Sequence, residues 1–378
     1  MTAVSGLVVI GSGAAGVSAA ETFRARHPNI PVRILTTDPA LPYAKPPLSK
    51  DFLCDRDTRL DLHSAAWFDR NRVELIRGVT VRGIDVERQE VVTAGGRRYA
   101  YWHLVVASGS AAVRPPVAGI ESALTLRSFA DAVALKMAAR YADCAVVIGA
   151  GLIGCEAASC LAGRGVATMI VAAEHVPLQR RFGAQAGERV AKILSDTGVR
   201  FAGDTTVAAI EDGRVVLGTG ETVEADLVVS AAGVRPDIRL AEAAGIATRD
   251  GRIVVDEHMH TSARNVYAAG DVALAHNVTA GRPIPAEHWR DAAHQGRVAG
   301  LTAAGFSAVW DIVPSYASVI DSSVLRYRGW GAGYERSRFV EHHNGFTVWY
   351  ESGDDVVGVL TLNADDDYRR AEQMLRSA

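Results

Sequence analysis

Two copies of one glycine pattern constrain the fold of this chain more than any other feature. Each copy has a short apolar run rich in β-branched residues, three glycines spaced G-x-G-x-x-G, and then a stretch that reads as a helix. The glycines are Gly11, Gly13 and Gly16 in the first copy and Gly149, Gly151 and Gly154 in the second. The first glycine of such a pattern makes the strand-to-helix turn, the second lets a pyrophosphate approach the backbone, and the third lets helix and strand pack closely. A single copy can be a glycine-rich turn that binds nothing, but the repeat predicts two dinucleotide-binding units.

An acidic residue follows each copy at about the 20-residue spacing expected of a ribose-binding acid. Asp38 comes after the extended run 32–35, and Glu174 comes after the predicted strand 166–173. The basic neighbours of Glu174, among them Arg180, would suit a 2′-phosphate instead. The acid slightly favours a ribose with a free 2′-hydroxyl, and a 2′-phosphate stays open.

Composition narrows the class of protein. The 378 residues allow two or three domains, and 48% apolar with 22% charged residues is ordinary for a globular protein. A net charge of -3 gives no reason to expect nucleic acid or an anionic membrane as a partner. No apolar run approaches the roughly 20 residues of a membrane span, and no signal-peptide pattern begins the chain. The expected location is cytoplasmic.

Further strands are predicted around these units. Residues 98–101 and 103–109 read as two separate strands, and residues 265–271 as a buried strand that ends in Gly270-Asp271 at the start of a helix. The Asp271 carboxylate would then lie near a ligand hydroxyl or phosphate, or would simply cap the helix, or both.

A proline-rich loop over residues 41–50 carries two of the chain's few lysines, Lys45 and Lys50. Prolines at 42, 46 and 47 fix the backbone and exclude regular helix and strand. The loop is either a stiff surface connection or a segment that carries the lysines over a bound nucleotide.

The cysteines are too few and too irregularly spaced for a disulfide framework. Cys155 and Cys160 fall on different faces of a predicted helix, which favours packing over a redox pair. Cys54 stands alone. The histidines His258 and His260 would share one strand face but have no further ligands at zinc-like spacing, so no metal site is expected.

The chain resembles the FAD-dependent pyridine nucleotide-disulfide oxidoreductases, in the branch of the ferredoxin, putidaredoxin and rubredoxin reductases and apoptosis-inducing factor. Four blocks carry the resemblance, together with the Pro-Tyr-x-basic-Pro-Pro-Leu-Ser-Lys loop at 42–50. The blocks are Val8–Gly16, His103–Gly109, Ile148–Glu156 and Thr261–Ala273.

The resemblance implies an α/β fold with two Rossmann-like domains, for FAD and NAD(P), and a small C-terminal α+β domain. The expected domain boundaries are residues 1–112 and 237–308 for the FAD domain, 113–236 for the NAD(P) domain and 309–378 for the C-terminal domain. The FAD pyrophosphate and ribose would be held by the first glycine turn and Asp38, an FAD phosphate by Lys45, and the ribityl chain by Asp271. The other cofactor-binding positions that the resemblance implies are Ala14, Ala15, Pro46, Val81, Ala107, Ser108, Gly109, Arg127, Ile153, Gly233, Gly270, His288 and Trp289.

Lys50 and Glu156 are the predicted catalytic residues. By resemblance, Lys50 approaches the flavin and pairs with Glu156, which orients the nicotinamide and stabilises charge on the reduced flavin. The alternative is an ordinary interdomain ion pair. His288 takes a place usually held by a small hydroxyl residue, either as a titratable group or as a structural histidine.

Two departures from the family bear on function. The family's disulfide reductases keep a cysteine pair near residues 42–50, and its absence disfavours peroxidase or coenzyme-A-disulfide chemistry. Tyr316 keeps an aromatic residue, whereas Ala317 stands where a tryptophan usually shields the flavin.

The resemblance therefore predicts an NAD(P)H-dependent reductase that passes electrons through FAD to a small ferredoxin serving a cytochrome P450 or Rieske oxygenase. The arginines Arg326 and Arg328 would offer a basic patch to an acidic ferredoxin, or would be ordinary solvated arginines. One alternative is direct reduction of a small molecule or oxygen, and another is an NAD(P)H-sensing flavoprotein. Both monomer and homodimer are compatible with the sequence.

Overall fold

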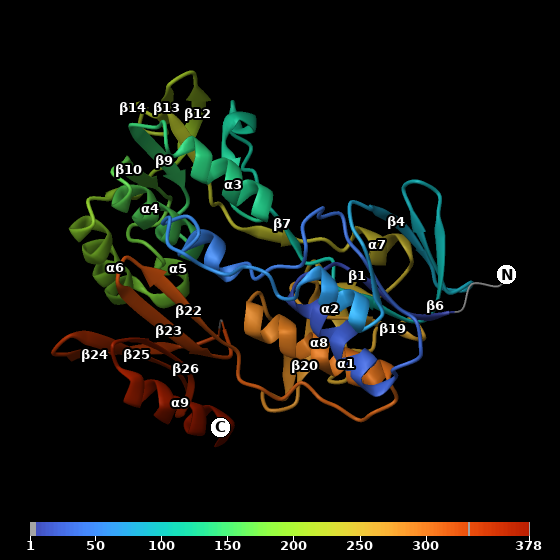
Figure 1. The fold of residues 1–378 in the computed structure, drawn as a ribbon. Coiled ribbons are helices and arrows are strands. Elements are labelled where there is room, and N and C mark those ends of the chain that lie inside the picture. Colours follow the sequence, from blue (N-terminus) through green and yellow to red (C-terminus); the bar gives the residue numbers. More distant parts are fainter. Residues whose placement is uncertain (1–4, 332, 378) are drawn as a thin grey trace. The chain divides into compact units, whose positions relative to one another are not determined.

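The computed structural model describes residues 5–331 and 333–377, which form two compact units (Figure 1). Unit 1 comprises the described residues up to Ala44, together with Leu60–Ala111 and Arg235–Ser315. Unit 2 comprises Lys45–Arg59, Ala112–Val234 and the described residues from Tyr316 onward. Among the described residues, no helix is both long and apolar enough to cross a membrane.

The main sheet of unit 1 has the strand order β3-β2-β1-β6-β5-β4, with β19 paired to β6. Its strands are β1 (Gly6–Ile10), β2 (Val32–Leu35), β3 (Val73–Ile76), β4 (Val81–Asp85), β5 (Glu90–Thr93), β6 (Arg98–Val106) and β19 (Val266–Ala268). β6 pairs antiparallel with β5 through its first residues and parallel with β1 through its last. The two strands predicted over 98–109 are therefore one, because the same strand serves two neighbours.

A smaller sheet and four helices complete unit 1. The sheet has the order β17-β18-β20-β21 and consists of β17 (Thr248–Arg249), β18 (Arg252–Val255), β20 (Ala273–Asn277) and β21 (Arg282–Pro285). The helices are α1 (Ala14–Arg26), α2 (Ala65–Arg70), α7 (Arg239–Ala243) and α8 (Trp289–Ala303). Figure 1 shows α1 and α8 packed side by side. Asp271 precedes strand β20, so the predicted helix start and N-cap at Asp271 are wrong.

Unit 2 repeats the strand–turn–helix–strand arrangement. Its parallel sheet has the order β11-β10-β9-β15-β8. The strands are β8 (Leu124–Thr125), β9 (Cys144–Ile148), β10 (Ala167–Val171), β11 (Arg200–Ala202) and β15 (Leu227–Ser230), and the helices are α3 (Phe129–Ala138), α4 (Leu152–Gly163), α5 (Gln179–Phe182) and α6 (Ala184–Asp196). An antiparallel sheet contains β12 (Val207–Glu211), β13 (Arg214–Leu217) and β14 (Thr222–Glu224).

Short elements lie near the boundaries of the units. β7 (Ser110–Ala112) pairs with β16 (Val234–Pro236), and each of these strands contains a boundary. A short 3-10 helix, η1 (Pro46–Ser49), forms in the proline loop, and another, η2 (Ile120–Ser122), precedes β8. The expectation that the loop excludes regular helix is therefore wrong for residues 46–49. Proline has no backbone N–H, but the N–H groups of a first helical turn make no hydrogen bond within the helix. Prolines are therefore tolerated at the first positions of a helix, where Pro46 and Pro47 stand in η1.

The last part of the chain is an antiparallel sheet covered by a helix. The sheet order is β22-β23-β26-β25-β24, with β22 (Ser315–Ile320), β23 (Ser323–Gly329), β24 (Arg336–His342), β25 (Gly345–Ser352) and β26 (Asp355–Leu362), followed by α9 (Asp365–Ser377). Arg328 is buried between this sheet and α9, where it pairs with Glu372 and lies over the Tyr368 ring. Its expected place in an exposed basic patch is wrong, because its guanidinium anchors the helix. Arg326 is half exposed and pairs with Asp365.

His258 and His260 do not share a strand face. Strand β18 ends before them at Val255, and the chain turns through residues 256–259. The two rings lie 5.9 Å apart, and each is close to a carboxylate of the turn. The turn is held by the Asp256 carboxylate, which accepts hydrogen bonds from the amides of both histidines.

Candidate active site

The first glycine turn joins β1 to α1 in unit 1. Gly11 has a φ of +104°, and a Cβ there would overlap the Ala107 carbonyl. A Cβ on Gly16 would overlap the Gly11 carbonyl, whereas Gly13 faces open space. α1 begins after Gly13 with no side-chain cap and no acid in its first turn. The amides at its positive end are thus available for an anion.

Asp38 lies just beyond the end of β2, and β2 is the neighbour of β1, the strand that the glycine turn follows. Its carboxylate accepts hydrogen bonds from the Tyr43 hydroxyl at 2.7 Å and from the Ala40 amide at 2.9 Å. Ser12 in the turn donates to Thr36 Oγ1 at 2.9 Å, which ties the glycine turn to the end of β2. These contacts hold the acid near the turn, the position in which a carboxylate binds a ribose.

A segment distant in sequence completes the surroundings of this turn. The glycines at 270 and 296 leave room for Ala15, because a Cβ on Gly270 would lie 3.2 Å from the Ala15 Cβ and one on Gly296 would overlap the Ala15 carbonyl. The Gly270 amide donates to Gln295 Oε1 at 2.8 Å. The Asp271 carboxylate accepts a hydrogen bond from Ser110 Oγ at 2.5 Å. Ala14, Ala15, Gly270 and Asp271 are thereby brought together, as a shared ligand would require.

The other predicted unit 1 positions lie on several elements. Ala107, Ser108 and Gly109 follow β6, and Ser108 Oγ donates to the Asp237 carbonyl at 2.8 Å. Val81 begins β4 and is half-buried. Lys45 and Pro46, also predicted as FAD ligands, belong instead to the segment that clusters with unit 2. Their contact with FAD stays a prediction.

The N-terminus of α8 carries His288 as its cap residue and Trp289 as its first residue. Asp291 lies in the first turn of α8 and is 0% exposed. Burial raises the pKa of Asp291 to about 7, although the nearby Arg290 and a hydrogen bond from the Ser315 backbone oppose this shift. Asp291 was not predicted as a site residue, because a polar residue in a first helical turn ordinarily faces solvent.

The second glycine turn joins β9 to α4 and repeats the geometry of the first. Gly149 has a φ of +106°, and a Cβ there would lie 2.6 Å from the Ala231 carbonyl. A Cβ on Gly154 would overlap the Gly149 carbonyl, and Gly151 faces open space. α4 also begins without a side-chain cap or an acid in its first turn. A second dinucleotide pyrophosphate fits this turn by the same argument.

The remaining predicted unit 2 positions vary in exposure. Ile153 is 43% exposed on the first turn of α4. Glu174 follows β10, is 23% exposed, and lies 3.4 Å from Arg180, which is itself 81% exposed. Gly233 has a φ of +102° and accepts a hydrogen bond from the Val113 amide. Arg127 precedes α3 and donates its amide to the Asp131 carboxylate.

Glu156 is the centre of a buried hydrogen-bonded group in unit 2. Its side chain is 2% exposed, and Lys50 Nζ lies 2.9 Å from Oε2. Ser49 Oγ donates to the same oxygen at 2.5 Å, and Ser318 Oγ donates to Oε1 at 2.6 Å. The predicted ion pair is present, and both partners belong to one unit. Ser49 and Ser318 were not predicted, because only the tertiary structure brings η1, α4 and β22 together.

Tyr316 and Ala317 are adjacent residues of strand β22 and lie on opposite faces of it. Residues alternate between the two faces of a strand, so Tyr316 and Ser318 share one face and Ala317 lies on the other. The Tyr316 hydroxyl accepts a hydrogen bond from Arg181 at 2.6 Å, and its ring lies 5.1 Å from Tyr327. Ala317 is exposed.

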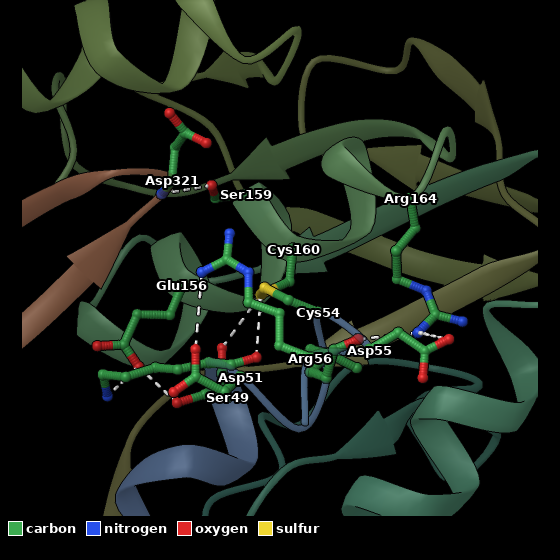
Figure 2. The surroundings of a disulfide bond; sticks show 12 residues. Ser49, Asp51, Cys54, Asp55, Arg56, Glu156, Ser159, Cys160, Arg164 and Asp321 are labelled. Carbon is green, nitrogen blue, oxygen red and sulfur yellow. Dashed lines mark hydrogen bonds and ion pairs between the residues drawn. A yellow bond between two sulfur atoms is a disulfide. The ribbon is translucent and has the colours of Figure 1, made fainter. Parts of the chain in front are cut away.

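A disulfide joins Cys54 to Cys160, with a Cα–Cα distance of 4.9 Å (Figure 2). The expectations that Cys54 stands alone and that Cys160 is only a packing residue are therefore wrong. Residues 50–56 fold back onto α4, a placement that the spacing along the chain did not reveal. Cys155 packs in the core as expected, and burial raises the pKa of its thiol.

Residues 5–296 match the family described as pyridine nucleotide-disulphide oxidoreductase. A rubredoxin-NAD(+) reductase of Pseudomonas putida is 31% identical over 354 residues, which cover 91% of each chain. The ferredoxin-NAD(+) reductase component of the anthranilate 1,2-dioxygenase system of Burkholderia cepacia is 31% identical over 383 residues, covering 97% of this chain and 93% of that protein.

A solved structure is similar over nearly the whole fold. A chain of the covalent putidaredoxin reductase–putidaredoxin complex matches with a TM-score of 0.93 and 28% identity, over 99% of this chain and 93% of that chain. The α/β fold class is thereby confirmed. The two uncapped glycine turns fit FAD and NADH or NADPH, the cofactors of this family. The chain belongs to the pyridine nucleotide-disulphide oxidoreductase family.

Proposed function

We propose that this protein transfers electrons from NADH or NADPH to a small iron–sulfur protein that serves an oxygenase. The observation that carries the proposal is the pair of uncapped glycine turns, one in each unit, each followed by an acid at the ribose position. The relatives named as reductases of rubredoxin and of a dioxygenase ferredoxin support the class of acceptor.

Unit 1 would hold FAD and unit 2 the nicotinamide coenzyme. The α1 amides would bind the FAD pyrophosphate, Asp38 a ribose hydroxyl, and Asp271 the ribityl chain. FAD held there would supply the conversion of a two-electron donor into single electrons, which suits a one-electron iron–sulfur acceptor.

Glu156 would act on the coenzyme within unit 2. It lies one turn into α4, near the turn that would bind the coenzyme pyrophosphate. Lys50, Ser49 and Ser318 occupy both of its oxygens, so the carboxylate is fixed before coenzyme binds. A fixed charged pair orients a nicotinamide without reorganisation during reaction. The approach of Lys50 to the flavin stays a prediction.

Glu174 supports NADH as the preferred coenzyme. A carboxylate three residues beyond the end of β10 would bind a ribose 2′-hydroxyl and repel a 2′-phosphate. Replacing Glu174 with Ala is expected to lower kcat/KM for NADH about tenfold. The ratio of kcat/KM for NADH to that for NADPH should fall accordingly. Steady-state rates with both coenzymes measure this, and an unchanged preference would contradict it.

Anaerobic stopped flow tests the electron-transfer function. FAD-loaded protein is mixed with NADH or NADPH and then with an oxidised [2Fe–2S] ferredoxin. The expected result is fast flavin bleaching, followed by reoxidation in step with ferredoxin reduction. Fast bleaching without reaction with any of several ferredoxins would instead favour a small-molecule or oxygen reductase. Slow bleaching with a long-lived charge-transfer complex would favour an NAD(P)H sensor.

The role of Glu156 is tested in the same instrument. Glu156→Gln keeps the size of the side chain but removes its charge, and flavin reduction is expected to slow about tenfold or more, or roughly 1.4 kcal/mol. The matched control is Glu188→Gln, an exposed acid of α6 in the same unit. Equal rates for the two variants would show that the Lys50–Glu156 pair is only structural.

A further inference from the structure

The Cys54–Cys160 disulfide runs beside the Lys50–Glu156 ion pair. Lys50 and Cys54 are four residues apart in one turn, because the Cys54 amide donates to the Lys50 carbonyl at 2.8 Å. Glu156 and Cys160 are also four residues apart, and that spacing places them on one face of α4. A covalent link and an ion pair thus join the same two elements about one turn apart.

We propose that Cys54–Cys160 is a thiol–disulfide exchange site whose co-substrate is a dithiol, and that its redox state controls how firmly the Lys50 segment is held on α4. The exchange itself is independent of the proposed function. Its consequence for hydride transfer rests on that function, through Lys50 and Glu156.

The exposure of Cys54 and Cys160 determines which of the two sulfur atoms the dithiol attacks. Cys54 is partly exposed, whereas Cys160 is 5% exposed. A thiolate of the dithiol attacks Cys54 Sγ, the S–S bond breaks, and the electron pair leaves on Cys160, which takes up a proton. The second thiol then attacks the mixed disulfide and releases Cys54 as a thiol. In total the dithiol becomes a disulfide, and the protein gains two electrons and two protons.

Contacts around the disulfide indicate what would hold the segment once the S–S bond is reduced. Cys160 Sγ lies 3.4 Å from the Lys50 carbonyl oxygen, so a thiol formed there has an acceptor nearby. The far end of the segment remains held, since Arg164 donates to the Leu53 carbonyl at 2.9 Å and Lys136 Nζ lies 2.6 Å from the Asp55 carboxylate. Figure 2 shows Arg164 reaching Asp55 beside the disulfide. Reduction therefore leaves the Lys50 end held on α4 by non-covalent contacts alone, which open more readily than the covalent link, and it does not release the whole segment.

Thiol counting on the FAD-loaded protein tests the site. After incubation in oxidised dithiothreitol, denatured protein is expected to react with two equivalents of maleimide-PEG, because two of the four cysteines remain free. After reduced dithiothreitol it should react with four. Four free thiols under both conditions would overturn the proposal.

Hydrogen exchange tests the consequence for the segment. Reduction is expected to speed amide exchange over residues 45–56 about tenfold in the wild-type holoenzyme, and to slow flavin reduction by NADH about threefold. Cys54→Ser should reproduce both effects without a reductant. The matched control is Cys144→Ser, a partly exposed free cysteine whose variant should still respond to dithiothreitol.

Unchanged exchange over residues 45–56 would overturn the proposal even if the disulfide forms. The wild-type measurement does not depend on whether a variant folds. Thiol counts and exchange rates involve neither coenzyme nor ferredoxin. A protein that shows both expected changes but reduces no ferredoxin therefore contradicts only the proposed function.

Discussion

At the scale of single residues, Asp291 is the least expected feature of the site. Its carboxyl group is buried at the start of α8, and burial raises its pKa to about 7 against the opposing effects of Arg290 and the Ser315 backbone. The ordinary pKa of an aspartate is about 3.9. Between these values the folded protein holds a proton that the unfolded chain has released, so raising the pH destabilises the fold.

Asp291→Asn is therefore expected to flatten the pH dependence of stability. The wild-type protein should lose up to about 1.4 kcal/mol of unfolding free energy per pH unit between about pH 4 and 7, because the folded-state pKa is raised. The variant should lose less, and should be the more stable of the two at pH 8. Denaturant unfolding of the FAD-loaded proteins measures this. The control is Asp366→Asn, an acid that is 96% exposed, and equal slopes for all three proteins would contradict the argument.

At the scale of elements, the close approach of α1 and α8 shapes the FAD turn. Gly296 and Gly300 of α8 lie against Ala15 and Ala19 of α1, and a Cβ on either glycine would meet α1 backbone. Because Ala15 also lies beside Gly270, the spacing of the helices fixes where the two segments of unit 1 meet.

Gly296→Ala is expected to push the helices apart, to destabilise the protein by about 1–3 kcal/mol as overpacking does, and to weaken FAD binding. The matched control is Gly163→Ala at the end of α4, where an added Cβ meets nothing within 4 Å. That variant should be neutral or slightly stabilising. Thermal unfolding and flavin retention on desalting measure both effects, and normal FAD retention by Gly296→Ala would contradict the prediction.

At the scale of the whole molecule, the two glycine turns lie in separate units. A substitution in one turn should therefore impair the binding of one cofactor and not of the other. An alanine at the third glycine of either turn would overlap the carbonyl of its first glycine. Gly16→Ala should lose FAD and its visible absorbance. Gly154→Ala should retain FAD that dithionite reduces, while NADH reduces it at least tenfold more slowly than in the wild-type protein. Absorbance spectra distinguish the two variants, and loss of FAD from Gly154→Ala would contradict this division.

The predictions from sequence succeeded where neighbouring residues decide the conformation. Both glycine turns have the expected strand before them and helix after them, since positive φ and close helix–strand packing depend on residues within one turn. The Lys50–Glu156 contact was predicted by resemblance to a family in which the same two segments meet. The catalytic roles of these residues and the cytoplasmic location remain predictions.

The sequence by itself determined the two dinucleotide turns, because a G-x-G-x-x-G turn is specified by residues adjacent in the chain. Only the tertiary structure decided that Asp271 precedes a strand, that Arg328 is buried, and that Cys54 meets Cys160. Each of these depends on which distant segment packs against the residue, and burial or pairing then overrides its local preference. The same packing removes water from Asp291 and Glu156, so the electrostatics of the site are a property of the fold.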